Sequence, residues 1–349
     1  MSGKEVFKRA LMAQDKKVRM CLEDTFKLKK IASLIKSAKN VVLTGCGDKF
    51  MISMISKCLA DYCLSKPFEV YHSRILANNM PKTITKDSII FFLTVRGKTI
   101  DVIEAIKEAK KRNAKIVIIT QLEKKHKDSI YSVLKGYDNY EVIIPIKGDA
   151  TTQPSTTTSA TFLSIINAII LYSADEEMDI NPFLQTLMNG LPKYLKEISN
   201  NKSFHDFCVK SALKIKKAKN PFLLFTGDGP RYPVCKKASQ IQFLEQCKLP
   251  GIAFQSEEFA NLILEEYINK DFGQIWILLK PIESFSGMNS MNRFNEMNLM
   301  INEKFKEDRI IIIDPLAFAL VPGKERINDF LLCPIYLLII EWLSYYCSV

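Results

Sequence analysis

The chain repeats one order of elements twice, and this repeat constrains its fold more than any other feature. An apolar run ending in T-G-x-G opens each half, and two further apolar runs follow it. The runs are 41–47, 89–94 and 115–120 in the first half, and 223–229, 275–280 and 309–314 in the second. A long apolar helix closes each half, at 160–174 and at 329–346. Residues with helical spacing lie between the runs, as in alternating β and α elements.

Such alternation predicts parallel sheets covered by helices on both faces. We therefore expect an α/β protein with two tandem doubly wound, flavodoxin-like domains of five strands each. Residues 1–195 would form the first domain with a helical leader, and residues 196–349 the second. In sheets of this kind ligands bind outside the carboxyl ends of the strands, where the polar turns of this sequence fall.

Composition narrows the class of protein. The 349 residues are 47% hydrophobic, the N-terminus lacks an apolar signal segment, and the run 331–343 is too short to span a bilayer. Nine cysteines without a C-x-x-C pair are typical of reduced thiols in a cytoplasm, and neither they nor the three scattered histidines predict a metal site. The net charge of +11 is spread along helical stretches, which favours anionic metabolites over nucleic acid or a membrane.

The loop 94–99, T-V-R-G-K-T, is the strongest candidate site. It follows a buried strand and precedes a helix, so free N–H groups and the positive end of the helix dipole would face a ligand there. Two hydroxyls, two cations and a glycine suit a small anion such as phosphate. The alternative is a plain strand-to-helix turn in which Thr99 is the N-cap.

Several stretches together resemble the sugar isomerase, or SIS, domain family. The double arrangement is similar to the isomerase half of glucosamine-fructose-6-phosphate aminotransferase and to AgaS-type and fructosamine-deglycase-type proteins. The matching stretches are 45–49 (family C-G-T-S), 94–99 (S-Q-S-G-E-T), 154–159 (a Ser/Thr-rich loop), 227–233 (G-R-G-D-Q-Y-P) and 256–259 (S-E-E-F). The resemblance covers residues 30 to 346, and its order is more convincing than any single motif.

The resemblance implies a dimer that binds a phosphorylated sugar or amino sugar without an organic cofactor or metal. By position it assigns phosphate contacts to Thr94, Arg96 and Thr99. The residues that would border the sugar are Gly47, Asp48, Ser155 and Thr156. The implied function is a phosphosugar isomerase, or an amino-sugar-phosphate deaminase or deglycase, that moves a proton between adjacent carbons of a hexose 6-phosphate.

Catalysis of that kind needs a base. Glu245 and Glu257 fall near the family's carboxylates, and we predict that one of them, Glu245 first, is shielded from water and acts as the base; the alternative for each is a salt-bridged surface glutamate. The family histidine that assists ring opening is replaced by Ala260, and no tail follows the closing helix. A non-catalytic sugar-phosphate-binding regulator is therefore the second interpretation. The sequence does not name the sugar.

A dinucleotide-binding domain is a weaker rival. Gly45 and Gly47 follow a strand as in G-x-G-x-x-G, but Phe50 occupies the position of the third glycine. The acidic residue about 20 positions on, Glu69, begins its strand instead of ending it, so it would not meet a ribose.

Overall fold

Each half of the chain contains one parallel sheet. The computed structural model describes residues 3–123, 129–146, 158–258, 273–282, 287–305, 309–318 and 329–348. The strand order is β2-β1-β3-β4-β5 in the first sheet and β7-β6-β8-β9 in the second. The strands are β1 Asn40–Gly45, β2 Phe68–His72, β3 Ser88–Leu93, β4 Lys115–Ile119, β5 Tyr140–Ile143, β6 Phe222–Thr226, β7 Gly251–Phe254, β8 Gln274–Leu279 and β9 Ile310–Ile313.

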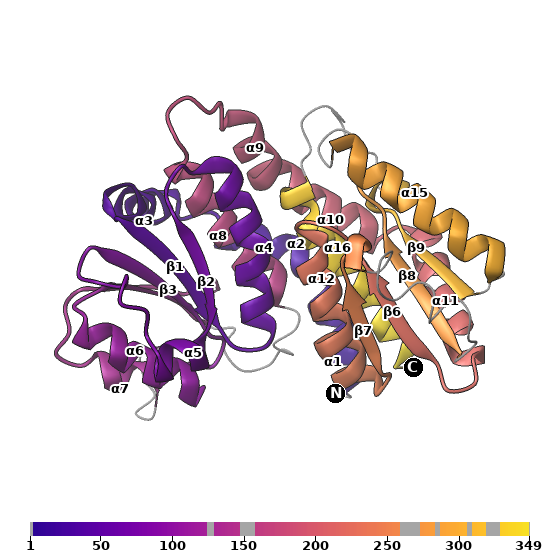
Figure 1. The fold of residues 1–349 in the computed structure, drawn as a ribbon, viewed down its shortest axis with the longest axis horizontal. Coiled ribbons are helices and arrows are strands. Elements are labelled where there is room, and N and C mark those ends of the chain that lie inside the picture. The colour runs from indigo at the N-terminus through magenta and orange to yellow at the C-terminus, as the bar shows by residue number, and fades with distance from the viewer. Residues whose placement is uncertain are drawn as a thin grey trace. The chain divides into compact units, whose positions relative to one another are not determined.

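The two orders agree in their first four members, which confirms the doubly wound repeat. In each sheet the first strand of the half lies between the second and the third (Figure 1). Five strands were predicted for both sheets; the first has five, and the described residues of the second form four.

The chain separates into two compact units that do not coincide with the two halves of the sequence. The N-terminal unit comprises residues 16–188, and the C-terminal unit comprises residues 1–15 together with 189–349. The predicted division was 1–195 and 196–349, which groups residues 1–15 with the first sheet. In the structure these residues belong to the unit that contains the second sheet. Helix α1 (Gly3–Met12) belongs to the C-terminal unit because Phe7 packs edge-on against Tyr345, with the ring centroids 5.9 Å apart.

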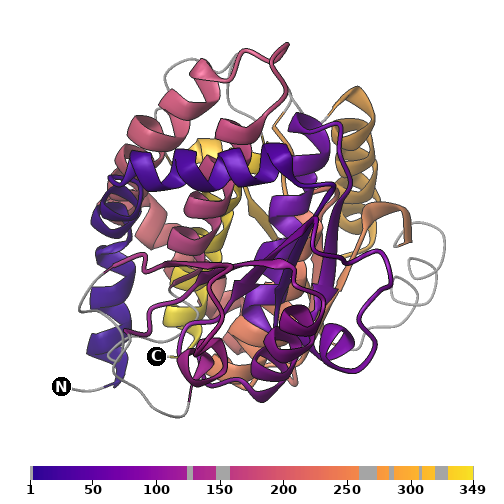
Figure 2. The same ribbon diagram turned by 90° about the vertical axis from the view of Figure 1, so that its left-hand side faces the viewer.

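In the N-terminal unit, helices cover both faces of the five-stranded sheet (Figure 1; Figure 2 gives a second direction). Alternate strand residues such as Ile90 and Phe92 pack with Val102 and Ile106 of α6 in one cluster. On the other face α4 contacts β1 and packs against α8, which in turn packs against α3. All six residues of β3 are buried, as expected for a strand covered on both sides. The helices are α2 Gln14–Cys21, α3 Thr25–Ser37, α4 Asp48–Cys63, α5 Ser73–Asn78, α6 Ile100–Lys111, α7 Ile130–Leu134, α8 Ser159–Ser173 and α9 Asn181–Gln185.

In the C-terminal unit, Trp276 and Leu278 of the sheet pack with Phe294 and Ile301 of α15 on one face. Helix α16 contacts α11, α12 and η3 on the other. Helix α16 is long and apolar enough to cross a membrane, but 83% of its most apolar window is buried in the unit, so it is the core helix that the sequence predicted. The elements are η2 Thr186–Gly190, α10 Leu191–Ser199, α11 Lys202–Lys217, α12 Arg231–Lys237, the π-helix η3 Ala238–Cys247, α13 Ser256–Glu258, α15 Gly287–Lys304, η6 Pro315–Ala317 and α16 Asp329–Cys347.

Candidate functional site

The loop 94–99 is held in one conformation by the loop that follows β4. Thr94 is buried, and its Oγ1 accepts a hydrogen bond from the Gly97 N–H at 3.2 Å. The Val95 carbonyl accepts from the Gln121 N–H, and the Gly97 carbonyl accepts from the Ile130 N–H. These bonds fix the backbone of the turn before any ligand arrives, so a ligand would meet a preformed site.

Gly97 is required by two features of this turn. Its φ of +59° lies in the left-handed region, and a Cβ there would approach Leu122 Cδ2 to 2.6 Å. A residue in this conformation beside extended or helical neighbours turns successive N–H groups toward one point, which is the geometry of an anion-binding nest. No backbone acceptor is found for the N–H groups of Lys98 and Thr99 within the described part of the chain.

The predicted phosphate ligands are accessible in different degrees. Arg96 and Thr99 are exposed, whereas Thr94 is 3% exposed. Thr99 is the N-cap residue of α6, but its side chain makes no capping bond, so the plain-cap alternative does not account for its hydroxyl. Ser155 and Thr156 lie outside the described residues.

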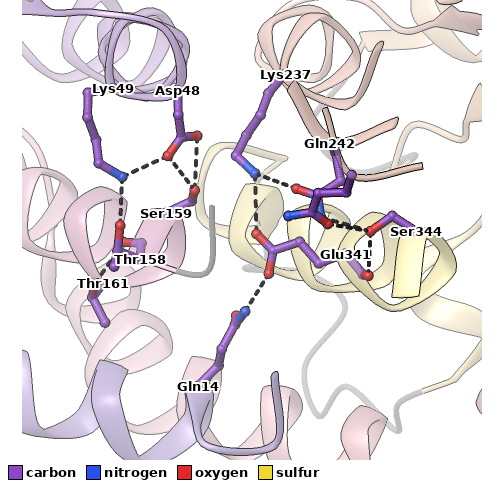
Figure 3. Close-up of polar contacts among 11 residues, drawn as sticks. Gln14, Asp48, Lys49, Thr158, Ser159, Thr161, Lys237, Gln242, Glu341 and Ser344 are labelled. Atoms are coloured by element: carbon purple, nitrogen blue, oxygen red, sulfur yellow. Dashed lines mark hydrogen bonds and ion pairs between the residues drawn. The ribbon is translucent and has the colours of Figure 1, made fainter. Parts of the chain in front are cut away.

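Gly47 and Asp48 lie at the start of α4, directly after β1. Gly47 is the N-cap with φ +52° and ψ −121°, a conformation that favours glycine. Asp48 is 8% exposed and does not point freely at a crevice: its Oδ2 accepts from Lys49 Nζ at 2.7 Å, and its carboxylate accepts from Ser159 Oγ at 3.1 Å (Figure 3). The sequence analysis did not assign a role to Lys49 or Ser159.

Lys49 belongs to a buried cluster with the first turn of α8. Its Nζ donates to Thr158 Oγ1 at 2.7 Å and lies 4.5 Å from the centroid of the Phe162 ring. The family's C-G-T-S turn has two hydroxyls where this chain has Asp48 and Lys49. An ion pair bonded to the start of the closing helix has thus replaced a pair of neutral polar groups.

The C-terminal unit has a buried cation at the equivalent position. Arg231 follows the second T-G-x-G turn by the same number of residues as Lys49 follows the first. Its Nη1 donates to Asp329 Oδ2 at 2.8 Å, and Asp329 is the first residue of the closing helix α16. In both units, therefore, a cation at the start of the helix that follows the first strand contacts the start of the long apolar helix that closes the half. Aligning Thr44 with Thr226 would have revealed the pair of cations in the sequence.

In the C-terminal unit, Lys280 follows β8 as Thr94 follows β3. The Nζ of this residue is paired with Asp314 Oδ2 at 2.8 Å, and its carbonyl accepts a hydrogen bond from the Tyr336 hydroxyl. Glu283 and Ser284 of the same stretch lie outside the described residues.

Glu245 and Glu257 belong to the C-terminal unit. Glu245 is exposed on η3, so its own unit does not shield it from water as we expected for a general base. Glu257 lies in α13, and its side chain is outside the described set.

A buried carboxylate does occur in this unit, at Glu341. It accepts from Lys237 Nζ at 3.3 Å and from Gln14 Nε2 (Figure 3), and both charged side chains are 1% exposed. In the sequence, Glu341 is the only acidic residue within the apolar run 331–343, and this isolated acid could have indicated the buried carboxylate.

The structure also gathers three chemically active side chains at the carboxyl ends of β1, β2 and β3. Cys46 follows β1, His72 ends β2, and Asp101 lies in the first turn of α6. Their ligand atoms all lie within 4.8 Å of one another, and each residue is half-buried. The sequence analysis gave no site role to Cys46 or Asp101.

The fold is that of a doubly wound α/β protein, and a preformed strand-to-helix turn lies at the carboxyl edge of its first sheet. Residues 34–172 match the model of the SIS domain. The chain therefore contains a SIS domain, as the motifs predicted.

Solved structures resemble the whole chain, not only its first half. The C-terminal domain of glucosamine-fructose-6-phosphate aminotransferase from Francisella tularensis has a TM-score of 0.71 at 14% identity, over 99% of this chain and 94% of that one. Tagatose-6-phosphate ketose/aldose isomerase from Escherichia coli has a TM-score of 0.69 at 12% identity, over 98% of this chain and 92% of that one. Glucosamine-6-phosphate deaminase from Thermotoga maritima has a TM-score of 0.66 at 14% identity, over 98% of this chain and 94% of that one. At these identities the likeness shows the fold. No curated protein sequence matches the chain.

Proposed function

We propose that the protein binds a hexose 6-phosphate or amino-hexose 6-phosphate at the loop 94–99 and acts on it as an isomerase or deaminase. The observation that carries this proposal is the turn before α6, in which Gly97 has a φ of +59° and the N–H groups of Lys98 and Thr99 have no backbone acceptor among the described residues. The names of the similar structures include a tagatose-6-phosphate isomerase and a glucosamine-6-phosphate deaminase, which supports this class of substrate.

We also infer that residues 196–349 form a second SIS domain and that the protein is a homodimer. The shared strand order and the two equivalent buried cations, Lys49 and Arg231, support the second domain. The site residues proposed in addition are Gly47, Asp48, Ser155 and Thr156 beside the sugar, with Glu245 or Glu257 as the base.

A second candidate function is binding without catalysis. The exposure of Glu245 favours it, because the base was expected to be shielded from water and Glu245 is not shielded within its own unit. The Asp48–Lys49 pair also favours it, since both groups are engaged with each other and with α8.

Substitution of Thr99 tests the phosphate site. Thr99→Val should weaken binding of fructose 6-phosphate and glucosamine 6-phosphate at least about tenfold, the loss expected from about 1.4 kcal/mol of charge-assisted hydrogen bonding. Calorimetric titration measures it, with Thr83→Val, an exposed threonine before β3, as the matched control. Unchanged affinity in Thr99→Val would refute the assignment.

Deuterium incorporation at C1 or C2 in heavy water then separates the two functions. Exchange into a bound sugar phosphate indicates a catalyst, and binding without exchange or product indicates a regulator. If exchange persists in both Glu245→Gln and Glu257→Gln, the base is another residue.

A further inference from the structure

We propose that Cys46, His72 and Asp101 form a binding site for a transition-metal ion, and that zinc fits it best. The proposal goes beyond the sugar-phosphate function and does not depend on it. A thiolate, an imidazole and a carboxylate are the three ligand types that zinc takes in proteins. A softer ion or a hard ion such as Mg²⁺ suits the mixed set less well.

The parallel sheet brings the three residues together. Gly45, the residue before Cys46, pairs with His72 on one side and with Leu93 on the other. The carboxyl ends of β2, β1 and β3 are therefore level, and the short loop after β3 leads into the first turn of α6, which contains Asp101. These are backbone positions fixed by strand pairing, so the cluster does not depend on the placement of one long side chain.

The spacing is that of ligands around an ion. A tetrahedral zinc with bonds of about 2.0–2.3 Å holds its ligand atoms roughly 3.5 Å apart. The atoms here lie within 4.8 Å of one another, so side-chain rotations that close about 1 Å would complete the shell. All three residues are half-buried, which leaves a fourth position open to water or a ligand.

The cluster lacks the hydrogen bonds of a nucleophilic triad. Within the described residues, no hydrogen bond joins Cys46, His72 and Asp101 to one another, whereas a Cys–His nucleophile needs one. His72 Nδ1 instead accepts a long bond, 3.3 Å, from the Arg74 N–H, and a metal ligated at this nitrogen would take the place of that bond. Burial, and to a lesser extent Asp101, raise the pKa of the Cys46 thiol, which is the reverse of nucleophile activation.

Charge balance favours a divalent ion. Binding would convert the Cys46 thiol to a thiolate and release its proton, so that the thiolate and the Asp101 carboxylate together neutralise a 2+ ion. The site lies beside the loop 94–99. If the sugar-phosphate proposal also holds, a metal ion at this site could polarise the carbonyl oxygen of the bound sugar.

Cobalt(II) is the probe, because a cobalt–thiolate bond absorbs in the near ultraviolet and reports the sulfur ligand directly. We expect the full-length, chelator-treated protein to bind one Co²⁺ with this band and to release it to Zn²⁺. Cys46→Ser should abolish the band. His72→Ala and Asp101→Asn should retain it and weaken binding at least about tenfold.

The matched control is Cys58→Ser, since Cys58 is a partly buried thiol of the same unit that is absent from the cluster. Circular dichroism verifies the folding of each variant. If Cys46→Ser does not fold, the affinity of His72→Ala for Co²⁺ still tests the proposal.

The proposal is overturned if the protein gives no thiolate band, or if the band survives in Cys46→Ser. It is equally overturned if His72→Ala and Asp101→Asn bind Co²⁺ as tightly as the parent. None of these measurements uses a sugar phosphate. Failure of the Thr99→Val test therefore leaves the metal site standing, and failure of the cobalt test leaves the sugar-phosphate site standing.

Discussion

Removing one partner of the ion pair between Arg231 and Asp329 should lower the free energy of unfolding strongly, whereas replacing both partners with apolar residues should change it little. The two side chains are 2% and 6% exposed and meet at 2.8 Å. Asp329→Asn or Arg231→Met removes one charge and leaves the other in a site that excludes water. Breaking a buried pair in this way costs about 3–5 kcal/mol, whereas replacing both partners with apolar residues of similar volume is often close to neutral. The double variant Arg231→Met/Asp329→Leu should therefore be more stable than either single variant.

The protein contains its own probe for this measurement. Its two tryptophans, Trp276 and Trp342, are both fully buried in the C-terminal unit, so their fluorescence reports the unfolding of the unit that contains the ion pair. With a slope of about 2 kcal/mol per molar urea, a loss of about 4 kcal/mol lowers the midpoint by about 2 M. The slope should be the same in all variants.

Glu197→Gln is the matched control. Glu197 pairs with Lys193 at 3.8 Å in the same unit, with side chains 37% and 58% exposed. An exposed pair of this kind contributes about 0–1 kcal/mol, so its midpoint should move by less than about 0.5 M. The reasoning is refuted if Asp329→Asn shifts no further than this control, or if the double variant is as unstable as the sum of the single ones.

Two further predictions concern the whole chain. Burial raises the pKa of Cys63 and of Cys247 to about 12 and that of Cys58 to about 11, so the folded state holds these protons more tightly than the unfolded state. The contribution of these protonated thiols to the free energy of unfolding is complete below the unfolded-state pKa of about 8.5 and is lost as the pH rises toward the folded-state values. The urea midpoint should therefore fall from pH 8.5 to 10.5, and a midpoint that stays constant over that range contradicts the prediction. The homodimer should appear as twice the chain mass in light scattering at micromolar concentration, and a monomer there would contradict the inference.

Local pattern was sufficient for the elements and for their order. The strands β1, β3, β4, β6 and β8 lie where the apolar runs predicted, because a strand buried on both faces needs a continuous apolar run. The turn 94–99 was also readable, since a glycine between hydroxyls after such a run marks a tight strand-to-helix loop. The apolar run 331–343 was judged too short to span a bilayer, and the structure buries it in α16.

Only the tertiary structure placed groups that are distant in the sequence. Asp48 was predicted as a sugar contact from its position, and only the packing of α8 showed that Ser159 lies against its carboxylate. Glu245 met the positional pattern of a base, but its exposure depends on which face of η3 turns outward. The association of α1 with α16 depends on a match between two apolar faces more than 300 positions apart, which no periodicity within either helix encodes.

The cluster of Cys46, His72 and Asp101 shows the same division. The sequence determined that each residue follows or ends a strand or begins a helix, because these elements are encoded by neighbouring residues. Neighbouring residues do not encode that β1 lies between β2 and β3; the flavodoxin-like class implied this order, and the pairing of β1 with both strands brings it about. The pairing of the strands, and with it the meeting of the three side chains, was decided by the tertiary structure.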